Sequence, residues 1–157
     1  MIRFIAAIDE KQGMADNHGI PWQGKVPSDL KDFRQETEGG TILMGYGTYV
    51  GFKEPLPRRR NLVALTKDEP LRPGFEPIRD ARDFLQKTSE DVWVIGGPSL
   101  FAETIDLADE LHLTHLSGDF HCTKFLPEYK DKFELIEKSA PITENGITYY
   151  FARYRKK

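Results

Sequence analysis

The chain has 157 residues, of which 39% are hydrophobic, 30% charged and 11% aromatic. This composition can fill one core of ordinary domain size and excludes a wholly disordered chain. The net charge of −3 provides no overall positive field for nucleic acid or an anionic membrane surface, and the single cysteine, Cys122, excludes an internal disulfide. The apolar run at 4–8 is too short for a signal-peptide core or a membrane span. We therefore expect one domain over residues 1–157, located in the cytoplasm.

Short apolar runs bounded by Gly, Pro or acidic residues predict buried strands at 2–8, 41–44, 61–66, 92–95 and 111–116. Helical patterns lie between them, at 28–38, in a short segment after Gly47, at 81–87 and at 98–105. This alternation predicts an α/β fold with crossover helices on a parallel sheet. The Pro-rich stretches at 55–57 and 70–77 are expected to be loops at the sheet edge.

The C-terminal part follows another pattern. Segments 133–139 and 147–154 alternate in the way of strands and are separated by Glu144-Asn145-Gly146, a typical hairpin turn. We therefore expect a long antiparallel hairpin, which makes the sheet mixed.

Two predicted strand-to-helix junctions are rich in glycine: 44–48, with Gly45 and Gly47, and 94–99, with Gly96 and Gly97. Glycine lets the backbone approach a ligand, and the free N–H groups at the start of the following helix attract anions. Two such junctions side by side would suit a dinucleotide. The alternative is that these glycines serve only the turns, and neither junction matches G-x-G-x-x-G.

The helix expected at 28–38 carries an acid on its apolar stripe. At 100° per residue Asp29 falls in line with Leu30 and Phe33, whereas Asp32 is predicted to lie on the outer side. An acid in a first turn commonly serves only the helix dipole or cap. A carboxylate on an apolar face is costly unless a partner meets it, and it suits a ligand with a fork of N–H donors, such as a 2-aminopyrimidinone ring.

Two other groups of residues resemble ligand sites. Arg58, Arg59 and Arg60 follow a Pro-Leu-Pro turn, and one of these guanidinium groups could clamp a ligand carboxylate, although a run of charges is most simply a solvated turn. His112 and His115 have a spacing found in metal sites, but on a strand they point to opposite faces. We expect no metal.

Seven motifs occur in the order and spacing typical of one known family. They are Ile5-Ala6-Ala7, Gly19-Ile20-Pro21-Trp22, Pro27-Ser28-Asp29-Leu30, Leu43-Met44-Gly45, Pro55-Leu56-Pro57-Arg58-Arg59, Val94-Ile95-Gly96-Gly97 and Leu113-Thr114-His115. On these motifs the sequence resembles the dihydrofolate reductase family over nearly its whole length. The resemblance implies a three-layer fold with an eight-stranded, mostly parallel sheet and four flanking helices.

The resemblance also implies a reaction and its residues. NADPH would reduce 7,8-dihydrofolate to 5,6,7,8-tetrahydrofolate, with hydride passing to pterin C6 and N5 taking a proton from water. Asp29 would hold the pterin N3 and 2-amino group, with Thr114 joined to it through water and Trp22 beside the same water network. Arg59 would hold the α-carboxylate of the glutamate tail. The pocket for the pterin and aminobenzoyl rings would be lined by Ile5, Leu30, Phe33, Phe52, Leu56 and Ile95.

The implied cofactor site runs along both glycine junctions, and the peptide between Gly96 and Gly97 is expected to be cis. Its residues would be Ala7, Met14, Gly19, Ile20, Gly45, Tyr46, Gly47, Thr48, Thr66, Lys67, Arg79, Gly96, Gly97, Pro98, Ser99, Leu100 and Phe101.

The sequence departs from the family pattern at several positions, including two that bear on the cofactor. Tyr46 and Ser99 stand where many bacterial relatives have arginines near the 2′-phosphate of the cofactor, which leaves Thr66, Lys67 and Arg79 as candidates for that contact. Cys122-Thr123-Lys124 replaces the Gly-Asp-Thr whose acid braces the loop over the nicotinamide.

Two other functions were considered. A riboflavin-pathway aminopyrimidine reductase shares the implied fold, but that family lacks the Pro-Trp and Pro-x-Asp-Leu motifs. A non-catalytic nucleotide-binding module needs neither a carboxylate on an apolar face nor Arg59. We therefore predict a monomeric enzyme that binds dihydrofolate and NADPH, with no nucleic-acid or membrane partner.

Overall fold

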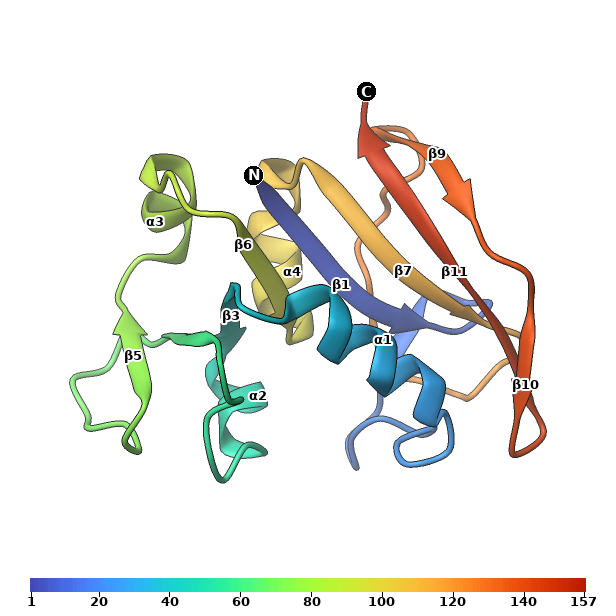
Figure 1. Ribbon diagram of the computed structural model, residues 1–157, viewed down its shortest axis with the longest axis horizontal. Coiled ribbons are helices and arrows are strands. Elements are labelled where there is room, and N and C mark those ends of the chain that lie inside the picture. Colours follow the sequence, from blue (N-terminus) through green and yellow to red (C-terminus); the bar gives the residue numbers. More distant parts are fainter.

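The computed structural model describes residues 1–157 and has one large sheet between helices (Figure 1). The strands are β1 (Ile2–Ile8), β2 (Gly13–Ala15), β3 (Thr41–Gly45), β4 (Arg60–Ala64), β5 (Phe75–Ile78), β6 (Val92–Gly96), β7 (Glu110–Leu116), β8 (Lys124–Phe125), β9 (Phe133–Lys138), β10 (Ile142–Glu144) and β11 (Ile147–Lys156). The helices are α1 (Pro27–Thr37), α2 (Tyr46–Val50), α3 (Ala81–Lys87), α4 (Pro98–Thr104) and the 3₁₀ turn η1 (Ile105–Leu107).

The large sheet has the order β10-β11-β7-β1-β6-β3-β4-β5. All pairings from β7 to β5 are parallel, and β11 runs antiparallel to β7. Strands β9 and β10 pair with different parts of β11, on the side away from β7, so they form one interrupted edge strand. Counted in this way the sheet has eight strands. The predicted mixed, mostly parallel α/β fold is confirmed.

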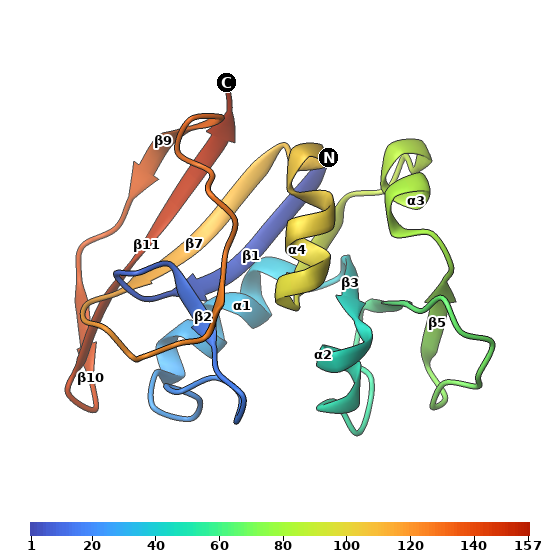
Figure 2. The same ribbon diagram turned by 180° about the vertical axis from the view of Figure 1, so that it is seen from behind.

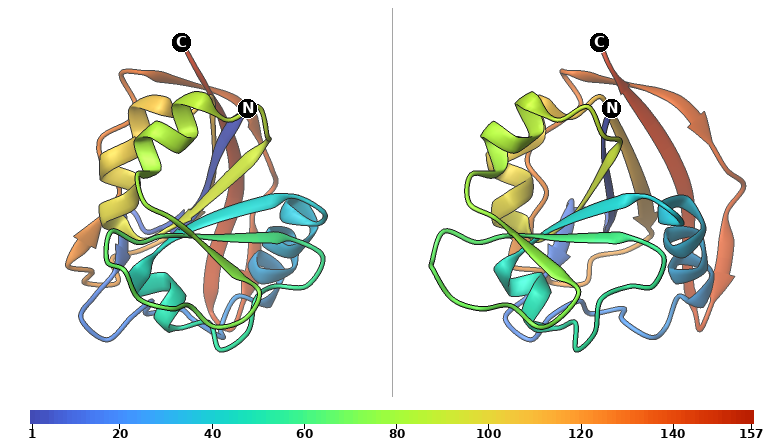
Figure 3. Two further views of the ribbon diagram at one scale, coloured as in Figure 1. Left: turned by 90° about the vertical axis from the view of Figure 1, so that its left-hand side faces the viewer. Right: turned by 60° about the vertical axis from the view of Figure 1, so that its left-hand side comes forward.

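Helices cover both faces of this sheet. Helix α1 lies on one face, and α3 and α4 lie on the other (Figures 2 and 3). Alternate residues of each central strand enter different cores: Phe4 and Val94 pack in the larger hydrophobic cluster, whereas Ile5 and Trp93 pack in a second one. None of the helices has both the length and the apolar character needed to cross a membrane.

The predicted elements are found with small shifts, and two predictions are wrong. The stretch 70–77, expected to be loop, contains the start of β5; Pro77 is tolerated there because β5 is an edge strand with one free side. In the tail, the turn at Asn145 and Gly146 joins β10 to β11, not 133–139 to β11. Both turn residues have positive φ, as the Asn-Gly sequence predicts for a tight hairpin.

Candidate active site

Asp29 lies in the first turn of α1, which begins with Pro27 where the missing N–H costs nothing. Its half-buried carboxylate faces the sheet, and its Oδ1 accepts a hydrogen bond of 2.6 Å from Thr114 Oγ1 on β7. The contact implied through water is therefore direct. No cation forms an ion pair with Asp29, so most of its acceptor capacity remains for a ligand.

The environment of Asp29 raises the pKa of its carboxyl above the usual value. Burial is the main cause, the hydrogen bond from Thr114 opposes it, and the nearby negative charge of Glu144 adds to it. Glu144 accepts hydrogen bonds from the Ser28 N–H (3.0 Å) and hydroxyl (2.5 Å) and from the Tyr149 hydroxyl. Sequence analysis missed Glu144, because only folding brings the β10–β11 hairpin to the start of α1.

The prediction for Asp32 is wrong. This residue is half-buried instead of lying on the outer side, and burial together with the charges of Glu36 and Asp29 raises the pKa of its carboxyl to about 6. The exposed residues of α1 include Leu30 and Arg34.

The predicted pocket residues meet beside Asp29. Five of the six pack in one hydrophobic cluster on the α1 side of the sheet: Ile5, Phe33, Phe52, Leu56 and Ile95. The sixth, Leu30, is 50% exposed. Trp22 is buried in a neighbouring cluster with Ala7 at its border, and its ring meets Phe120 edge-on, with ring centroids 5.1 Å apart.

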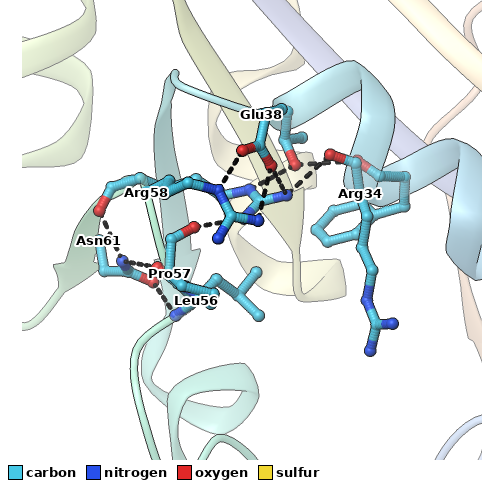
Figure 4. Close-up of polar contacts among 9 residues, drawn as sticks. Arg34, Glu38, Leu56, Pro57, Arg58 and Asn61 are labelled. Carbon is cyan, nitrogen blue, oxygen red and sulfur yellow. Dashed lines mark hydrogen bonds and ion pairs between the residues drawn. The ribbon is translucent and has the colours of Figure 1, made fainter.

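Arg59 lies on the turn between α2 and β4, and its side chain bonds Thr37 and Arg34 at the C-terminal end of α1. Figure 4 shows its neighbours on this turn, Leu56 and Pro57. Asn61 shapes this turn: its side-chain amide donates to the carbonyls of Leu56 and Arg59, and its carbonyl accepts from the Leu56 N–H, each at 3.0 Å. The Arg59 side chain is only 3% exposed and is held against the end of α1.

The two glycine junctions lie side by side, as predicted, because β3 pairs with β6. The Gly96–Gly97 peptide is cis, as predicted. A Cβ on Gly45 would lie 3.4 Å from the Gly97 nitrogen, and one on Gly97 would lie 3.4 Å from Thr48 Oγ1. The two turns therefore pack closely against each other, and glycine at these positions is what lets their backbones come this close.

Four predicted cofactor residues, Tyr46, Thr66, Lys67 and Arg79, line one pocket at the ends of β4 and β5. Sequence analysis missed three acids in the same lining: Glu69, Asp80 and Glu103. Arg79 is engaged by Asp68 (3.0 Å) and by the Lys67 carbonyl (2.8 Å).

The remaining predicted cofactor residues differ in exposure. The side chains of Met14, Leu100 and Phe101 are buried in the larger core, so only their backbone can face a ligand. Gly19, Ile20 and Ser99 are exposed.

The loop that contains Met14 is braced by backbone contacts in place of the missing acid. Strand β2 pairs with β8, and the Thr123 N–H donates to the Ala15 carbonyl (2.9 Å). The buried Asp9 adds to this, since its carboxylate accepts from the N–H groups of Gly13 (2.8 Å) and Phe120 (2.9 Å).

Comparison with known proteins agrees with this geometry. The sequence model of the family described as dihydrofolate reductase matches residues 1–156. The chain belongs to the dihydrofolate reductase family. It is 30% identical to the dihydrofolate reductase of Bacillus subtilis over 162 aligned positions, covering 100% of this chain and 95% of that protein. It is 33% identical to a type 3 dihydrofolate reductase of Salmonella typhimurium, covering 82% of this chain and 80% of that protein.

A solved structure of a family member shows the same fold. Dihydrofolate reductase from Enterococcus faecalis, complexed with NADP(H) and RAB-propyl, superposes with a TM-score of 0.88 at 25% identity, covering 100% of this chain and 96% of that one. These matches favour neither the riboflavin-pathway reductase nor a non-catalytic module.

Proposed function

We propose that this member of the dihydrofolate reductase family relies on Asp29 to hold the pterin ring of its substrate. As a member of its family, the chain catalyses the NADPH-dependent reduction of 7,8-dihydrofolate to 5,6,7,8-tetrahydrofolate. The observation that carries the proposal is a half-buried carboxylate with no cation partner, on the same helix as Phe33, which packs in the apolar cluster with Ile5 and Ile95. An apolar pocket with one well-placed polar group is the usual form of a small-molecule site.

Asp29 and Arg59 define the two ends of the substrate. The pterin N3–H and 2-amino group present two parallel donors, which a carboxylate can accept at once. The five pocket residues clustered near Asp29 take the apolar faces of the pterin and aminobenzoyl rings. The buried guanidinium of Arg59 then meets the α-carboxylate of the glutamate tail.

The residues along the two glycine junctions fit NADPH. Thr48 and the backbone of Gly45, Gly96 and Gly97 come together where the two turns pack. The extended central part of the cofactor runs across these turns. Tyr46, Thr66 and Lys67 line the pocket for its adenosine end, with Lys67 as the cation for the 2′-phosphate. Bound NADPH supplies the hydride, which passes from nicotinamide C4 to pterin C6.

The protein's part in the proton transfer is to hold and polarise the ring. The carboxylate of Asp29 favours the ring form with protons on N3 and the 2-amino group, and N5 takes its proton from water, without direct transfer from Asp29. Trp22 is buried beside Ala7 and excludes further water from this end of the pocket.

The direct test is an activity assay with a matched pair of variants. The purified protein, given NADPH and dihydrofolate, should lose absorbance at 340 nm at a rate that Asp29→Asn cuts severely. Asp131→Asn, on the exposed turn before β9, removes the same charge far from the pocket and should leave the rate unchanged. A fully active Asp29→Asn enzyme would overturn the role of Asp29.

We also propose that the chain works as one domain and as a monomer, in the cytoplasm and without nucleic acid. The net charge of −3 supports the last point. Sedimentation equilibrium tests the monomeric state, and a mass of twice 18.0 kDa would contradict it.

A further inference from the structure

The guanidinium of Arg59 is already surrounded by acceptors from its own chain. Its Nε donates to Thr37 Oγ1 (2.9 Å), Nη1 to the Pro57 carbonyl (2.6 Å) and Nη2 to the Arg34 carbonyl (2.7 Å). Nη2 also forms an ion pair of 3.3 Å with Glu38 Oε2. A ligand carboxylate that binds both terminal nitrogens therefore meets a carboxylate already in place.

Glu38 bridges two arginines. It directly follows α1. One oxygen of its carboxylate pairs with Arg59, and both oxygens accept hydrogen bonds from Arg58, one from Nε and the other from Nη2 at 3.5 Å (Figure 4). These bonds hold the pKa of the Glu38 carboxyl below its usual value, with Arg58 the main cause. Glu38 is therefore charged at neutral pH and competes with another anion for Arg59.

The two arginines differ in what they can do. Arg59 is 3% exposed and fixed by three neutral acceptors, whereas the Arg58 side chain is 70% exposed. Arg58 has a φ of +58°, a backbone conformation that non-glycine residues seldom adopt, and its carbonyl accepts from the Gly39 N–H (3.1 Å). The turn thus holds Arg58 beside Glu38 whether or not Arg59 has another partner.

We propose that Glu38 is a specificity-determining residue of the substrate site. Its carboxylate pairs with the Arg59 guanidinium, which the glutamate tail of the substrate also needs. Arg58 holds Glu38 in place when the tail binds. The proposal rests on the function given above. It predicts that a glutamate tail adds less to the binding affinity of a ligand than it would if the buried Arg59 had no carboxylate partner.

The test compares two inhibitors that share a 2,4-diaminopyrimidine ring: methotrexate, which carries a glutamate, and trimethoprim, which carries no carboxylate. Dissociation constants are measured by calorimetry on the NADPH-bound enzyme. Glu38→Gln keeps the side-chain shape and should tighten methotrexate binding about 3-fold, the scale of a partly exposed ion pair, while leaving trimethoprim unchanged. Glu54 is an exposed acid in the loop after α2, and Glu54→Gln is the matched control for the change in overall charge. It should change the dissociation constant of neither inhibitor.

A second arm tests the role of Arg58. Arg58→Asn removes the cation but tolerates positive φ, so Glu38 should transfer its whole interaction to Arg59 and methotrexate binding should weaken about 3-fold. In a Glu38→Gln background the same change should have little effect, because the competing carboxylate is gone.

The outcomes separate this inference from the function itself. If the unmodified enzyme binds neither inhibitor, the proposed function fails. If both inhibitors bind but Glu38→Gln changes both equally, or changes neither, Glu38 does not set tail specificity and only this inference is overturned.

Discussion

The two ends of the proposed substrate site, the pterin end at Asp29 and the tail end at Arg59, treat charge in opposite ways. At the pterin end, Asp29 has one hydroxyl donor and no cation, and burial raises the pKa of its carboxyl. At the tail end, Arg59 is surrounded by three neutral acceptors and a carboxylate. The charge of Asp29 has only this one donor until a ligand supplies more, whereas the charge of Arg59 is satisfied by the chain itself.

This difference indicates where binding energy and selectivity come from. A ligand that pairs with Asp29 relieves an existing desolvation cost, so that contact can discriminate strongly. A ligand carboxylate at Arg59 only replaces one partner by another, so the net gain is smaller. We expect the pterin end to decide whether a molecule reacts, and the tail end to adjust how tightly it binds.

The largest expected effect is that of Asp29→Asn on catalysis. The amide keeps the shape but loses the charge that favours the reactive ring form, so kcat should fall on the order of a hundredfold at neutral pH. Steady-state kinetics on the variant and on Asp131→Asn measure it, with circular dichroism to verify folding. A fall in kcat of less than threefold would mean that the charge of Asp29 contributes no more to the reaction than the tail contact at Arg59 contributes to binding.

Arg59→Ala should have the next largest effect, confined to the tail. KM for dihydrofolate should rise about tenfold, equivalent to about 1.4 kcal/mol, because the lost contact is charge-assisted but had a competitor. KM for a pteridine without a glutamate should stay the same. Arg60→Ala is the matched control, since Arg60 is paired with Glu76 and Glu90. Equal rises for both substrates would show that Arg59 is not the tail anchor.

A smaller effect is expected at the adenosine end, where the cation is exposed. Lys67→Gln should weaken NADPH binding about fivefold, near 1 kcal/mol, because solvent screens this site, and should leave NADH binding unchanged. Fluorescence titration with both cofactors checks this. An enzyme that binds both equally before any mutation would contradict a role for Lys67 in selecting the phosphate.

The smallest effect expected is a gain in stability from Asp29→Asn. The pKa of this carboxyl is raised in the folded protein, so its charged form destabilises the fold at neutral pH, and this penalty disappears as the pH falls below the unfolded value of 3.8. Urea unfolding should show the variant more stable at pH 7 than the parent protein, with the difference shrinking toward pH 3.5. A less stable variant at pH 7 would show that the charge is compensated after all.

Local patterns determined most of the fold. Strand β1 and helix α3 have the predicted bounds, because each is a periodic apolar segment with clear ends. The strands that were missed, β2, β5, β8 and β10, have two to four residues each and acquire their conformation from a partner strand. Such short segments carry too little periodicity to be recognised.

The features of the candidate site also divide into those that follow from local sequence and those that depend on the tertiary structure. The sequence by itself determined that Asp29 falls in line with apolar residues of its helix, that two predicted strands end in glycine-rich junctions, and that an arginine follows the Pro-Leu-Pro turn, because each depends on spacing within one segment. Only the tertiary structure decided that Thr114 bonds Asp29 directly, that Asp32 is half-buried, that Glu144 lies near Asp29 and that Glu38 reaches Arg59. Such contacts join residues far apart in the chain: Thr114 and Asp29 are 85 positions apart. Charge interactions depend on distance and burial in space, and neither is encoded in the local pattern of the chain.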